Sequence, residues 1–400
     1  MIKKFAMGSL ILILFLALGI LESTPKAVAA EVEWITFGMN VPLSGAGAAG
    51  WGIPPLRAAK MRAKEANDAG GVTIGGKTYK FKIFAADNKY SVEGGRAFAE
   101  KLVYQEKGRY VCGVTGSGPC LGMQEVTERA KVLNLFSVWD RTSLGPNKPY
   151  SFRVYNLANE LSIPTMNAVK KKYPDAKTIA FIAPNAPNGR DNAASEMELC
   201  PRYGWKTVAD EYYEMGTTDF YPIVTKIKAK KPDIIDFANT GPSSAALIMK
   251  ALYEVGWKGI TFSATGQQAE AITEIAGKAA TEGFIYGMGW DCAGPLVSPE
   301  LRELAKKYEA KYKEPLVIIA AAAYAGADAI IRAMKKADSI DTTLVRDTLA
   351  EMKWEGILGP THIGGEKSYG IKRVFVFPAI VSEVQNGKGV DIDKISFEVP

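Results

Sequence analysis

Short apolar runs typical of strands alternate along this chain with amphipathic stretches typical of helices. The first strand-like run covers residues 34–41, and a helical pattern follows over residues 56–69. Residues 72–83 form two alternating arms around Gly75-Gly76, which predicts a hairpin. Because strand and helix patterns continue to alternate through the first third of the chain, the region is predicted to be α/β with a mostly parallel sheet.

A second series of the same kind begins after residue 151. Its strand-like runs are residues 178–182, 233–237 and 260–262. Short, right-handed connections would make each series a lobe, with a mostly parallel sheet flanked by helices. Helical patterns beyond residue 299 are predicted to return to the first lobe, and a hairpin over residues 371–384 to cross back. Three crossings would then form a hinge.

These patterns divide the chain into a leader and two similar lobes. The predicted boundaries are residues 1–30 for a signal peptide, residues 31–152 and 288–371 for lobe 1, and residues 153–287 and 372–400 for lobe 2. The mature chain of roughly 370 residues exceeds what one hydrophobic core usually serves, which favours two domains. Ligands of such sheets bind at the carboxyl ends of the strands.

The leader has the pattern of an export signal. Two lysines precede an apolar run over residues 5–21, and small alanines favour cleavage before Ala30 or Glu31. A transmembrane anchor is the alternative, because a run of this length lies at the short end of what spans a bilayer. The leader contains no cysteine for lipid attachment. We therefore expect a freely diffusing protein in a Gram-negative periplasm.

Composition and charge agree with a globular protein that does not bind nucleic acid. Hydrophobic residues make up 47% of the chain and charged residues 23%. The net charge is +6, and the lysines are spread along helical patterns such as residues 226–231. Solvated helix faces explain this distribution better than a nucleic-acid partner does.

The four cysteines are Cys112, Cys120, Cys200 and Cys292, and none has the CxxC spacing of a zinc or redox site. No metal site is expected. In an oxidising compartment, Cys112 and Cys120 could pair across the glycine-containing segment between them and stiffen the loop around Ser117. The alternative is that Cys112 is a buried strand residue and that all four cysteines are free thiols.

Gly45, Gly47 and Gly50 follow a predicted strand with the GxGxxG spacing of dinucleotide-binding folds. In that fingerprint the helix begins among the glycines, whereas the prolines at residues 54 and 55 would delay a helix here. An exported protein also meets little NAD. We therefore expect no cofactor and interpret the segment as a flexible loop that contacts a ligand.

Several short motifs occur together in one order. They are Pro42-Leu-Ser-Gly45, residues 66–71, Asp87, residues 113–117, Ala276-Gly277 and Leu358-Gly-Pro360. With these motifs the mature chain resembles the leucine/isoleucine/valine-binding protein family, which comprises type I periplasmic solute-binding proteins of ABC importers. The resemblance implies a monomer that binds a small molecule between two lobes, with an ABC permease complex of the inner membrane as its partner. The identity of the ligand does not follow, because pockets vary within one architecture.

The resemblance also implies a carboxylate site in lobe 1. Residues 113–117 match the segment whose serine and backbone N–H groups hold a ligand carboxylate, so Gly116 and Ser117 are candidate ligand-binding residues. A helix predicted from Pro119 would add unpaired N–H donors and the positive end of its dipole. The alternative is an ordinary turn, since Gly-Ser-Gly-Pro is also common turn chemistry.

Aromatic residues flank this candidate site in the sequence. Trp51 corresponds to a position where the family places an aromatic side chain over the ligand. Trp139 and Arg141 lie where amino-acid binders carry small residues and a threonine that touch the ligand. Asp140 and Arg141 could bind a polar group of the ligand or pair with each other.

In lobe 2 the resemblance points to three further ligand-binding residues. Asn188 and Thr240 fall at or near positions where the family has tyrosines. Gly266 falls where an acidic residue holds the α-ammonium group, and losing that carboxylate would weaken amino-acid binding in a closed cleft. Gln267, in the same loop, could donate amide hydrogen bonds to a neutral or anionic head group.

Two ligand classes remain open after this comparison. Asp140 or Glu270 could replace the missing acid, which keeps a branched-chain amino acid-like ligand possible. Trp51, Trp139 and Trp290 favour an aromatic or other organic acid or amide, although each could be a core residue.

An enzyme has little support. The single histidine, His362, stands in a short strand-like run, and the chain lacks HExxH, nucleophile-elbow and phosphate-loop motifs. A secreted hydrolase would depend on an assembly such as Ser117 with His362. The chief alternative to an ABC importer component is a sensory protein that presents its closed form to a membrane receptor.

Overall fold

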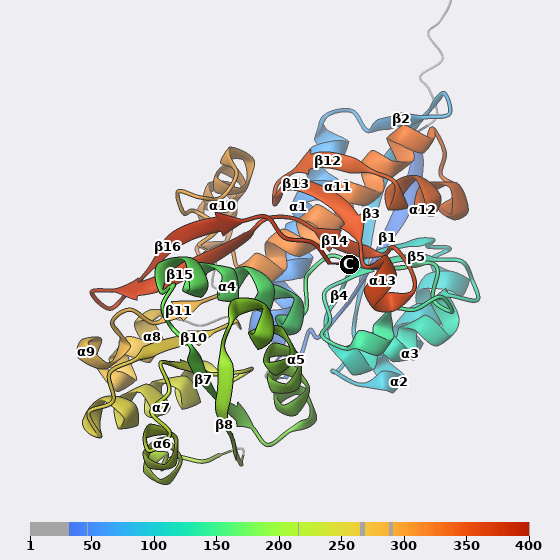
Figure 1. Ribbon diagram of the computed structural model, residues 1–400. Coiled ribbons are helices and arrows are strands. Elements are labelled where there is room, and N and C mark those ends of the chain that lie inside the picture. Colours follow the sequence, from blue (N-terminus) through green and yellow to red (C-terminus); the bar gives the residue numbers. More distant parts are fainter. Residues whose placement is uncertain (1–31, 46, 215, 265–268, 288–290, 400) are drawn as a thin grey trace, which may run out of the picture.

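The computed structural model describes residues 32–45, 47–214, 216–264, 269–287 and 291–399. The strands form two separate sheets, and Figure 1 shows them in two lobes that lie side by side. Most neighbouring strands near the centre of each sheet are parallel. The prediction of an α/β fold with two mostly parallel sheets flanked by helices is confirmed.

Within the described residues, the first sheet has nine strands in the order β12-β13-β14-β6-β5-β4-β1-β3-β2. Its strands are β1 Glu33–Val41, β2 Val72–Ile74, β3 Lys77–Asp87, β4 Tyr110–Val114, β5 Leu133–Phe136, β6 Ser151–Arg153, β12 Lys353–Gly356, β13 Gly359–Gly364 and β14 Val374–Val376. The helices of this lobe are α1 Ile53–Asp68, α2 Val92–Glu100, α3 Ser117–Thr127, α10 Pro299–Tyr312, α11 Ile318–Ala337, α12 Thr342–Ala350 and α13 Glu366–Tyr369, with shorter segments η1 Ala48–Gly52, η2 Lys101–Gln105 and η3 Arg141–Ser143.

The second sheet has seven strands in the described part of the chain, in the order β16-β15-β11-β10-β9-β7-β8. Its strands are β7 Thr178–Pro184, β8 Lys206–Tyr213, β9 Ile234–Asp236, β10 Ile260–Ser263, β11 Ile285–Tyr286, β15 Ala379–Gln385 and β16 Lys388–Ile395. The helices of this lobe are α4 Ala158–Lys172, α5 Pro187–Tyr203, α6 Tyr221–Lys228, α7 Pro242–Glu254, α8 Ala269–Ala276 and α9 Lys278–Thr281.

In each sheet, the chain adds strands first on one side of its starting strand and then on the other side. From β1 the chain moves to β3 on one side and then to β4 on the other, and from β7 it moves to β8 and then to β9. Right-handed crossovers in opposite directions place successive helices on opposite faces of the sheet. The carboxyl ends of β1 and β4, and of β7 and β9, are therefore the places where ligands bind in open sheets of this kind.

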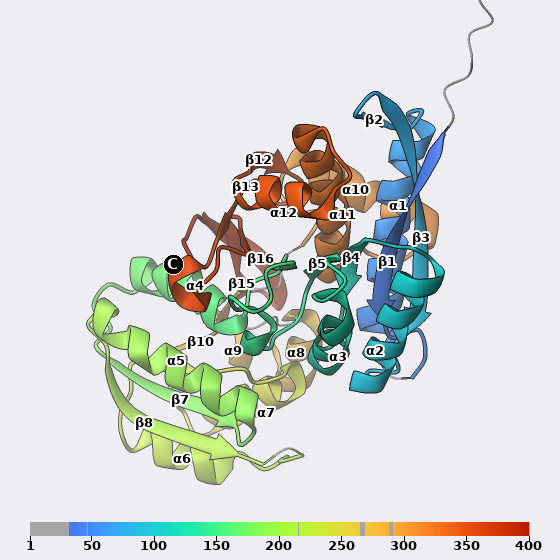
Figure 2. The ribbon, with the colours of Figure 1, turned by 90° about the vertical axis from the view of Figure 1, so that its right-hand side faces the viewer.

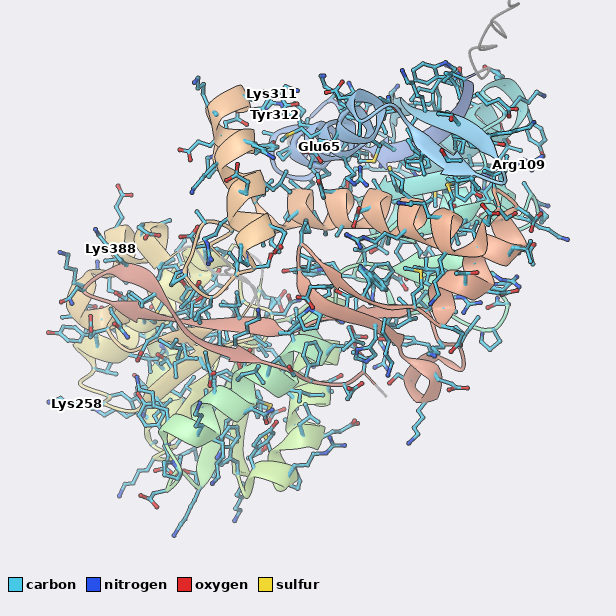
Figure 3. The ribbon with its side chains drawn as sticks, turned by 90° about the horizontal axis from the view of Figure 1, so that it is seen from above. Glu65, Arg109, Lys258, Lys311, Tyr312 and Lys388 are labelled. Atoms are coloured by element: carbon cyan, nitrogen blue, oxygen red, sulfur yellow. The ribbon has the colours of Figure 1, made fainter. Side chains whose placement is uncertain are left out.

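Strands in the middle of both sheets are buried on both faces, which explains their continuous apolar runs. On β7, Ile179 and Phe181 pack toward one core, and Ala180 and Ile182 pack toward the other. In lobe 1, α1 and α11 are further joined through the Tyr324 hydroxyl, which donates to the Glu65 carboxylate labelled in Figure 3. Each lobe thus has its own packed interior.

The hairpin predicted around Gly75-Gly76 is confirmed, with β2 antiparallel to β3. The hairpin predicted over residues 371–384 is wrong. β14 pairs with β6 and β13 in the first sheet, whereas β15 pairs with β11 and β16 in the second. The chain therefore crosses between the lobes at Phe377-Pro378, and lobe 1 extends to Arg153 and Val376, slightly beyond its predicted ends.

The predicted disulfide between Cys112 and Cys120 is wrong, because all four cysteines are free and buried. Cys112 lies on β4, where its Sγ atom is 3.7 Å from the Gly38 carbonyl oxygen and 3.5 Å from Met39 Sδ. Cys120 lies in α3, within the same hydrophobic core. Burial raises the pKa of the Cys112 thiol to about 12 and that of Cys120 further. The alternative of four free thiols is confirmed.

The predicted signal peptide, residues 1–30, lies outside the described residues. In the part of the chain that is described, no helix combines the length and apolar character needed to cross a membrane.

Candidate functional site

Loops that follow β1, β3, β4 and β5 meet at one edge of the first sheet, because parallel strands end at a common edge. Figure 2 shows β1 and β3 running downward to this edge, on the side of lobe 1 nearer to lobe 2. Trp51 follows β1, Gly116 and Ser117 follow β4, and Trp139 follows β5. The structure therefore brings these four predicted residues to the same edge of lobe 1.

Ser117 is the first residue of α3, and Gly116 directly precedes the helix with φ 95° and ψ 122°. Only glycine adopts this backbone conformation readily, and it turns the chain from β4 straight into the helix. Because the N-cap residue is this glycine, no N-cap side chain accepts from the first N–H groups of α3. Pro119 has no N–H, so the first-turn N–H groups without a partner among the described residues are those of Ser117 and Gly118. With the Ser117 hydroxyl they suit a carboxylate.

Asn88, at the end of β3, fixes the position of these loops. Its side chain is fully buried, and Nδ2 donates to the carbonyl oxygens of Asn40 and Thr115, both at 3.1 Å. The Thr115 hydroxyl in turn donates to the Trp51 carbonyl oxygen at 2.7 Å. Sequence reasoning missed Asn88 and Thr115, although their place directly after apolar runs was an available signal.

Asp87, a residue of the recognised motifs, has a structural role in the same region. Its carboxylate accepts hydrogen bonds from the Ser44 hydroxyl at 2.5 Å, the Leu43 N–H at 2.9 Å and the Lys89 N–H at 3.0 Å. These bonds, that from Ser44 first, lower the pKa of Asp87. Asp87 therefore stays ionised and holds the loop after β1 in place.

The loop after β5 presents one aromatic and one basic side chain. Trp139 is 42% exposed, and Arg141 is exposed as well. Asp140 accepts from the Thr142 N–H at 2.7 Å and from the Thr142 hydroxyl at 2.5 Å, so that it caps the short helix η3. No Asp140–Arg141 ion pair occurs in the described structure, and the idea that these two residues pair with each other is wrong.

The GxGxxG segment is itself helical. The π-helical segment η1 begins at Ala48, among the glycines, and continues directly into α1 at Ile53, which has prolines in its first turn. The prediction that a helix is delayed beyond the glycines is wrong, because the prolines fit the first turn of α1 and a wider helical turn precedes them. A Cβ atom at Gly52 would lie 1.6 Å from the Pro42 carbonyl oxygen, so this glycine allows the two backbone segments to touch. Trp51, beside it, is 49% exposed.

In lobe 2, two of the predicted residues lie on either side of the β7/β9 switch point. Asn188 is in the first turn of α5, directly after β7. Thr240 follows β9 and is buried, and its hydroxyl donates to the Ile182 carbonyl oxygen at 3.2 Å. Gly266, Gln267 and Trp290 lie outside the described residues.

A pair of buried acidic residues in lobe 2 was not predicted. Glu196 on α5 and Asp236 at the end of β9 are both fully buried. Burial raises the pKa of Asp236 well above its ordinary value, and the neighbouring Glu196 raises it further. Burial likewise raises the pKa of Glu196, which accepts from the Ser162 hydroxyl at 2.5 Å. Asn192 and Glu196 are four residues apart and therefore share one face of α5, which was the available signal.

Where the chain first crosses between the lobes, a buried ion pair joins them. Arg153 at the end of β6 is fully buried, and its Nη2 atom donates to the Glu160 carboxylate on α4 and to the Tyr369 hydroxyl at 3.0 Å. The Tyr369 hydroxyl donates to the same carboxylate at 2.5 Å. The Arg153 guanidinium also stacks 4.7 Å from the centre of the Tyr369 ring. This cluster links β6 and α13 of lobe 1 to α4 of lobe 2.

A catalytic pair of Ser117 and His362 is excluded by the order of the strands. His362 lies on β13, four positions from β4 in the sheet, so that the two strands are separated by about 19 Å. Its Nε2 atom lies 3.0 Å from a carboxylate oxygen of Glu398 instead.

Known proteins share this architecture. A family model described as periplasmic binding protein matches residues 34–387. The chain is 25% identical over 325 residues to Leu/Ile/Val-binding protein homolog 1 of Brucella suis biovar 1, which covers 79% of this chain and 82% of that protein.

Two solved structures are similar in fold. One is a branched-chain amino acid transporter substrate binding protein of Streptococcus pneumoniae in complex with isoleucine, with a TM-score of 0.68, 23% identity and coverage of 92% of this chain and 100% of that one. The other is a solute binding protein of an ABC transporter from Rhodopseudomonas palustris in complex with 3,4-dihydroxybenzoic acid, with a TM-score of 0.68, 20% identity and coverage of 91% and 97%. Because the family model spans most of the sequence, the chain belongs to the periplasmic binding protein family, and the resemblance to its Leu/Ile/Val-binding members is confirmed.

Proposed function

We propose that this chain is the extracytoplasmic solute-binding component of an ABC importer and that it captures a small carboxylate-bearing ligand between its lobes. The observation that carries the proposal is the uncapped amino terminus of α3 at the β1/β4 switch point. There the N–H groups of Ser117 and Gly118 and the Ser117 hydroxyl can all donate to one anion. A ligand carboxylate would complete the hydrogen bonding of this helix end.

The ligand class includes branched-chain amino acid-like compounds and aromatic or other organic acids. Isoleucine and 3,4-dihydroxybenzoate are bound by two proteins of similar fold, and both compounds contain a carboxylate. The exposed Trp51 and Trp139 lie at the same edge as Ser117 and would contact the apolar part of the ligand.

Lobe 2 is proposed to close over the ligand with Asn188, Thr240 and Gln267. A ligand that touches both lobes stabilises only the closed arrangement, so binding shifts the population toward that form. The permease of the importer would recognise the two aligned lobe surfaces of a monomer. Family membership and the export-like leader support a periplasmic location.

A thermal-shift titration of the refolded mature chain with isoleucine, leucine, benzoate and 3,4-dihydroxybenzoate tests the proposal. A ligand present at a hundred times its Kd stabilises the folded state by about 2.7 kcal/mol. For a chain of about 370 residues we expect the midpoint of unfolding to rise by roughly 3–4 °C. Absence of a shift with every carboxylate would overturn the proposal.

Ser117→Ala and Ser298→Ala form a matched pair for this assay. Ser298 caps α10, where its hydroxyl oxygen accepts from the Leu301 N–H at 3.0 Å. The same hydroxyl donates at 2.6 Å to the carbonyl oxygen of Ile357, between β12 and β13. We expect Ser298→Ala to lower the free energy of unfolding by about 1 kcal/mol and to leave the ligand shift intact. We expect Ser117→Ala to leave the free energy of unfolding nearly unchanged and to reduce the ligand shift, because Gly116, not Ser117, is the N-cap residue of α3. Equal effects of both variants on binding would remove Ser117 from the site.

A further inference from the structure

Exposed aromatic side chains gather at the proposed ligand edge of lobe 1. Among the described residues, the exposed aromatic side chains are Trp34, Trp51, Tyr90, Tyr104, Trp139, Tyr221 and Tyr253. Three of them follow strands that end at this edge: Trp51 follows β1, Tyr90 follows β3 and Trp139 follows β5. Tyr90 was not identified from the sequence. It is 58% exposed, more than either tryptophan.

The backbone of Tyr90 is held in an uncommon conformation. Lys89 and Tyr90 have φ angles of 48° and 55°, in the left-handed region that bulky residues rarely adopt. The Asn88 side chain stabilises this turn, because its Oδ1 atom accepts from the Tyr90 N–H at 2.9 Å. Asn88 is the same residue that bonds to the ends of β1 and β4. Directly after Tyr90, the Ser91 hydroxyl caps α2 by accepting from the Gly94 N–H at 3.0 Å.

The ring of Tyr90 lies directly on two glycines of the site. A Cβ atom at Gly116 would come 3.2 Å from Tyr90 Cε2, and one at Gly47 would come 3.7 Å from Tyr90 Cδ2. Gly116 precedes Ser117 at the amino terminus of α3. The Gly47 carbonyl oxygen accepts from the Trp51 N–H at 2.9 Å. The ring thus lies between the loop that contains Trp51 and the helix end that would hold a carboxylate.

These rings are unpartnered within the described part of the chain. Several core aromatics stack on one another, for example Tyr203 on Trp205 with ring centres 4.9 Å apart. Trp51, Tyr90 and Trp139 make no such ring contact with a described residue. A rigidly supported and exposed ring beside an anion site is suited to cover a flat apolar group, because stacking adds to the gain from buried area.

We propose that Tyr90 is a ligand-contacting residue that, together with Trp51, selects ligands whose carboxylate is attached to a planar aromatic ring. This inference rests on the proposed function, since the carboxylate at Ser117 fixes where the ligand is anchored. The ring of the ligand stacks on Tyr90, whereas a saturated ring of the same size offers no flat face for stacking. The site therefore prefers an aromatic carboxylate to its saturated analogue.

Benzoate and cyclohexanecarboxylate are the matched probes for this preference, with isoleucine as a third ligand. Isothermal titration of the refolded mature chain should show benzoate binding roughly tenfold more tightly than cyclohexanecarboxylate. Tyr90→Asn removes the ring but keeps a residue that tolerates left-handed backbone. We expect it to weaken benzoate binding roughly tenfold and to abolish the preference. Tyr90→Phe should retain both.

Tyr104→Ala is the control for loss of an exposed tyrosine, because Tyr104 lies in η2 of the same lobe and is 64% exposed. It should change neither affinity. The selection by Tyr90 is overturned if Tyr90→Asn behaves like Tyr104→Ala. It is also overturned if the unaltered chain binds isoleucine but prefers cyclohexanecarboxylate to benzoate. In both cases the proposed function stands. If none of the three carboxylates binds, the proposed function fails and this inference fails with it.

Discussion

Asp236→Asn should remove a pH dependence from the stability of the folded protein. Asp236 is fully buried, and its carboxyl group lies within hydrogen-bonding reach of the Glu196 carboxyl group. Its pKa in the folded state is raised well above the ordinary value of 3.8. The folded protein therefore keeps a proton that the unfolded chain releases. Stability is greatest below the unfolded pKa and falls as the pH rises toward the folded pKa.

One retained proton sets the size of this effect. The free energy of unfolding should fall by about 1.4 kcal/mol for each pH unit between the unfolded and folded pKa values of Asp236. Asp236→Asn introduces a neutral side chain of nearly the same shape, so the part of the fall that comes from Asp236 should vanish. The part that comes from Glu196, whose pKa burial also raises, should remain. Urea unfolding at pH 4.5, 5.0 and 5.5 would compare the two slopes. In that range the variant should lose about 1.4 kcal/mol less than the unaltered protein.

Asp233→Asn is the control, because Asp233 lies on the same segment and its pKa shifts the other way. Its carboxylate accepts from the N–H groups of Lys177 and Thr178, both at 2.9 Å, which lowers its pKa. Replacing it should reduce stability above the unfolded pKa and leave the Asp236 slope in place. Equal slopes for Asp236→Asn and the unaltered protein would refute the reasoning, since the buried carboxyl would then be ionised.

Two further predictions concern buried groups. Glu160→Gln leaves the buried Arg153 guanidinium without its counter-charge and should lower the free energy of unfolding by about 3 kcal/mol in urea unfolding. Glu125→Gln removes an exposed ion pair with Arg96 and should leave the free energy of unfolding almost unchanged. Equal losses would show that the cluster between the lobes is solvated. All four cysteines should resist a thiol reagent in the folded protein and react after denaturation, and rapid reaction of the native protein would contradict their burial.

The alternation of apolar runs predicted two sheets because the strands at the centre of each sheet are buried on both faces. The same local pattern failed between residues 371 and 384, where two apolar arms surround Pro378. Arms of this kind suit a hairpin or a crossing between lobes equally well. Only the pairing of β14 with β6, and of β15 with β11, decides between them.

The predicted site residues of lobe 1 came together because each follows a strand that ends at one edge. Neighbouring residues whose role depends on contacts between distant segments were not predicted. Asn88 donates hydrogen bonds to Asn40 and Thr115, which are 48 and 27 positions away in the sequence. No sequence pattern links these three residues. That network and the close approach of Gly47 and Gly116 position the aromatic ring of Tyr90.

The sequence by itself determined the α/β class, the two-lobed organisation and the presence of a helix after β4, because each depends on the periodicity or backbone preference of a short stretch. The helix begins at Ser117, two residues before the predicted Pro119. Only the tertiary structure decided that the thiols stay apart, that Asp236 is buried beside Glu196, and that Arg153 joins both lobes through Glu160. Those outcomes depend on which surfaces pack together. Packing is set by contacts between distant segments, and a local pattern of hydrophobic and polar residues does not encode it.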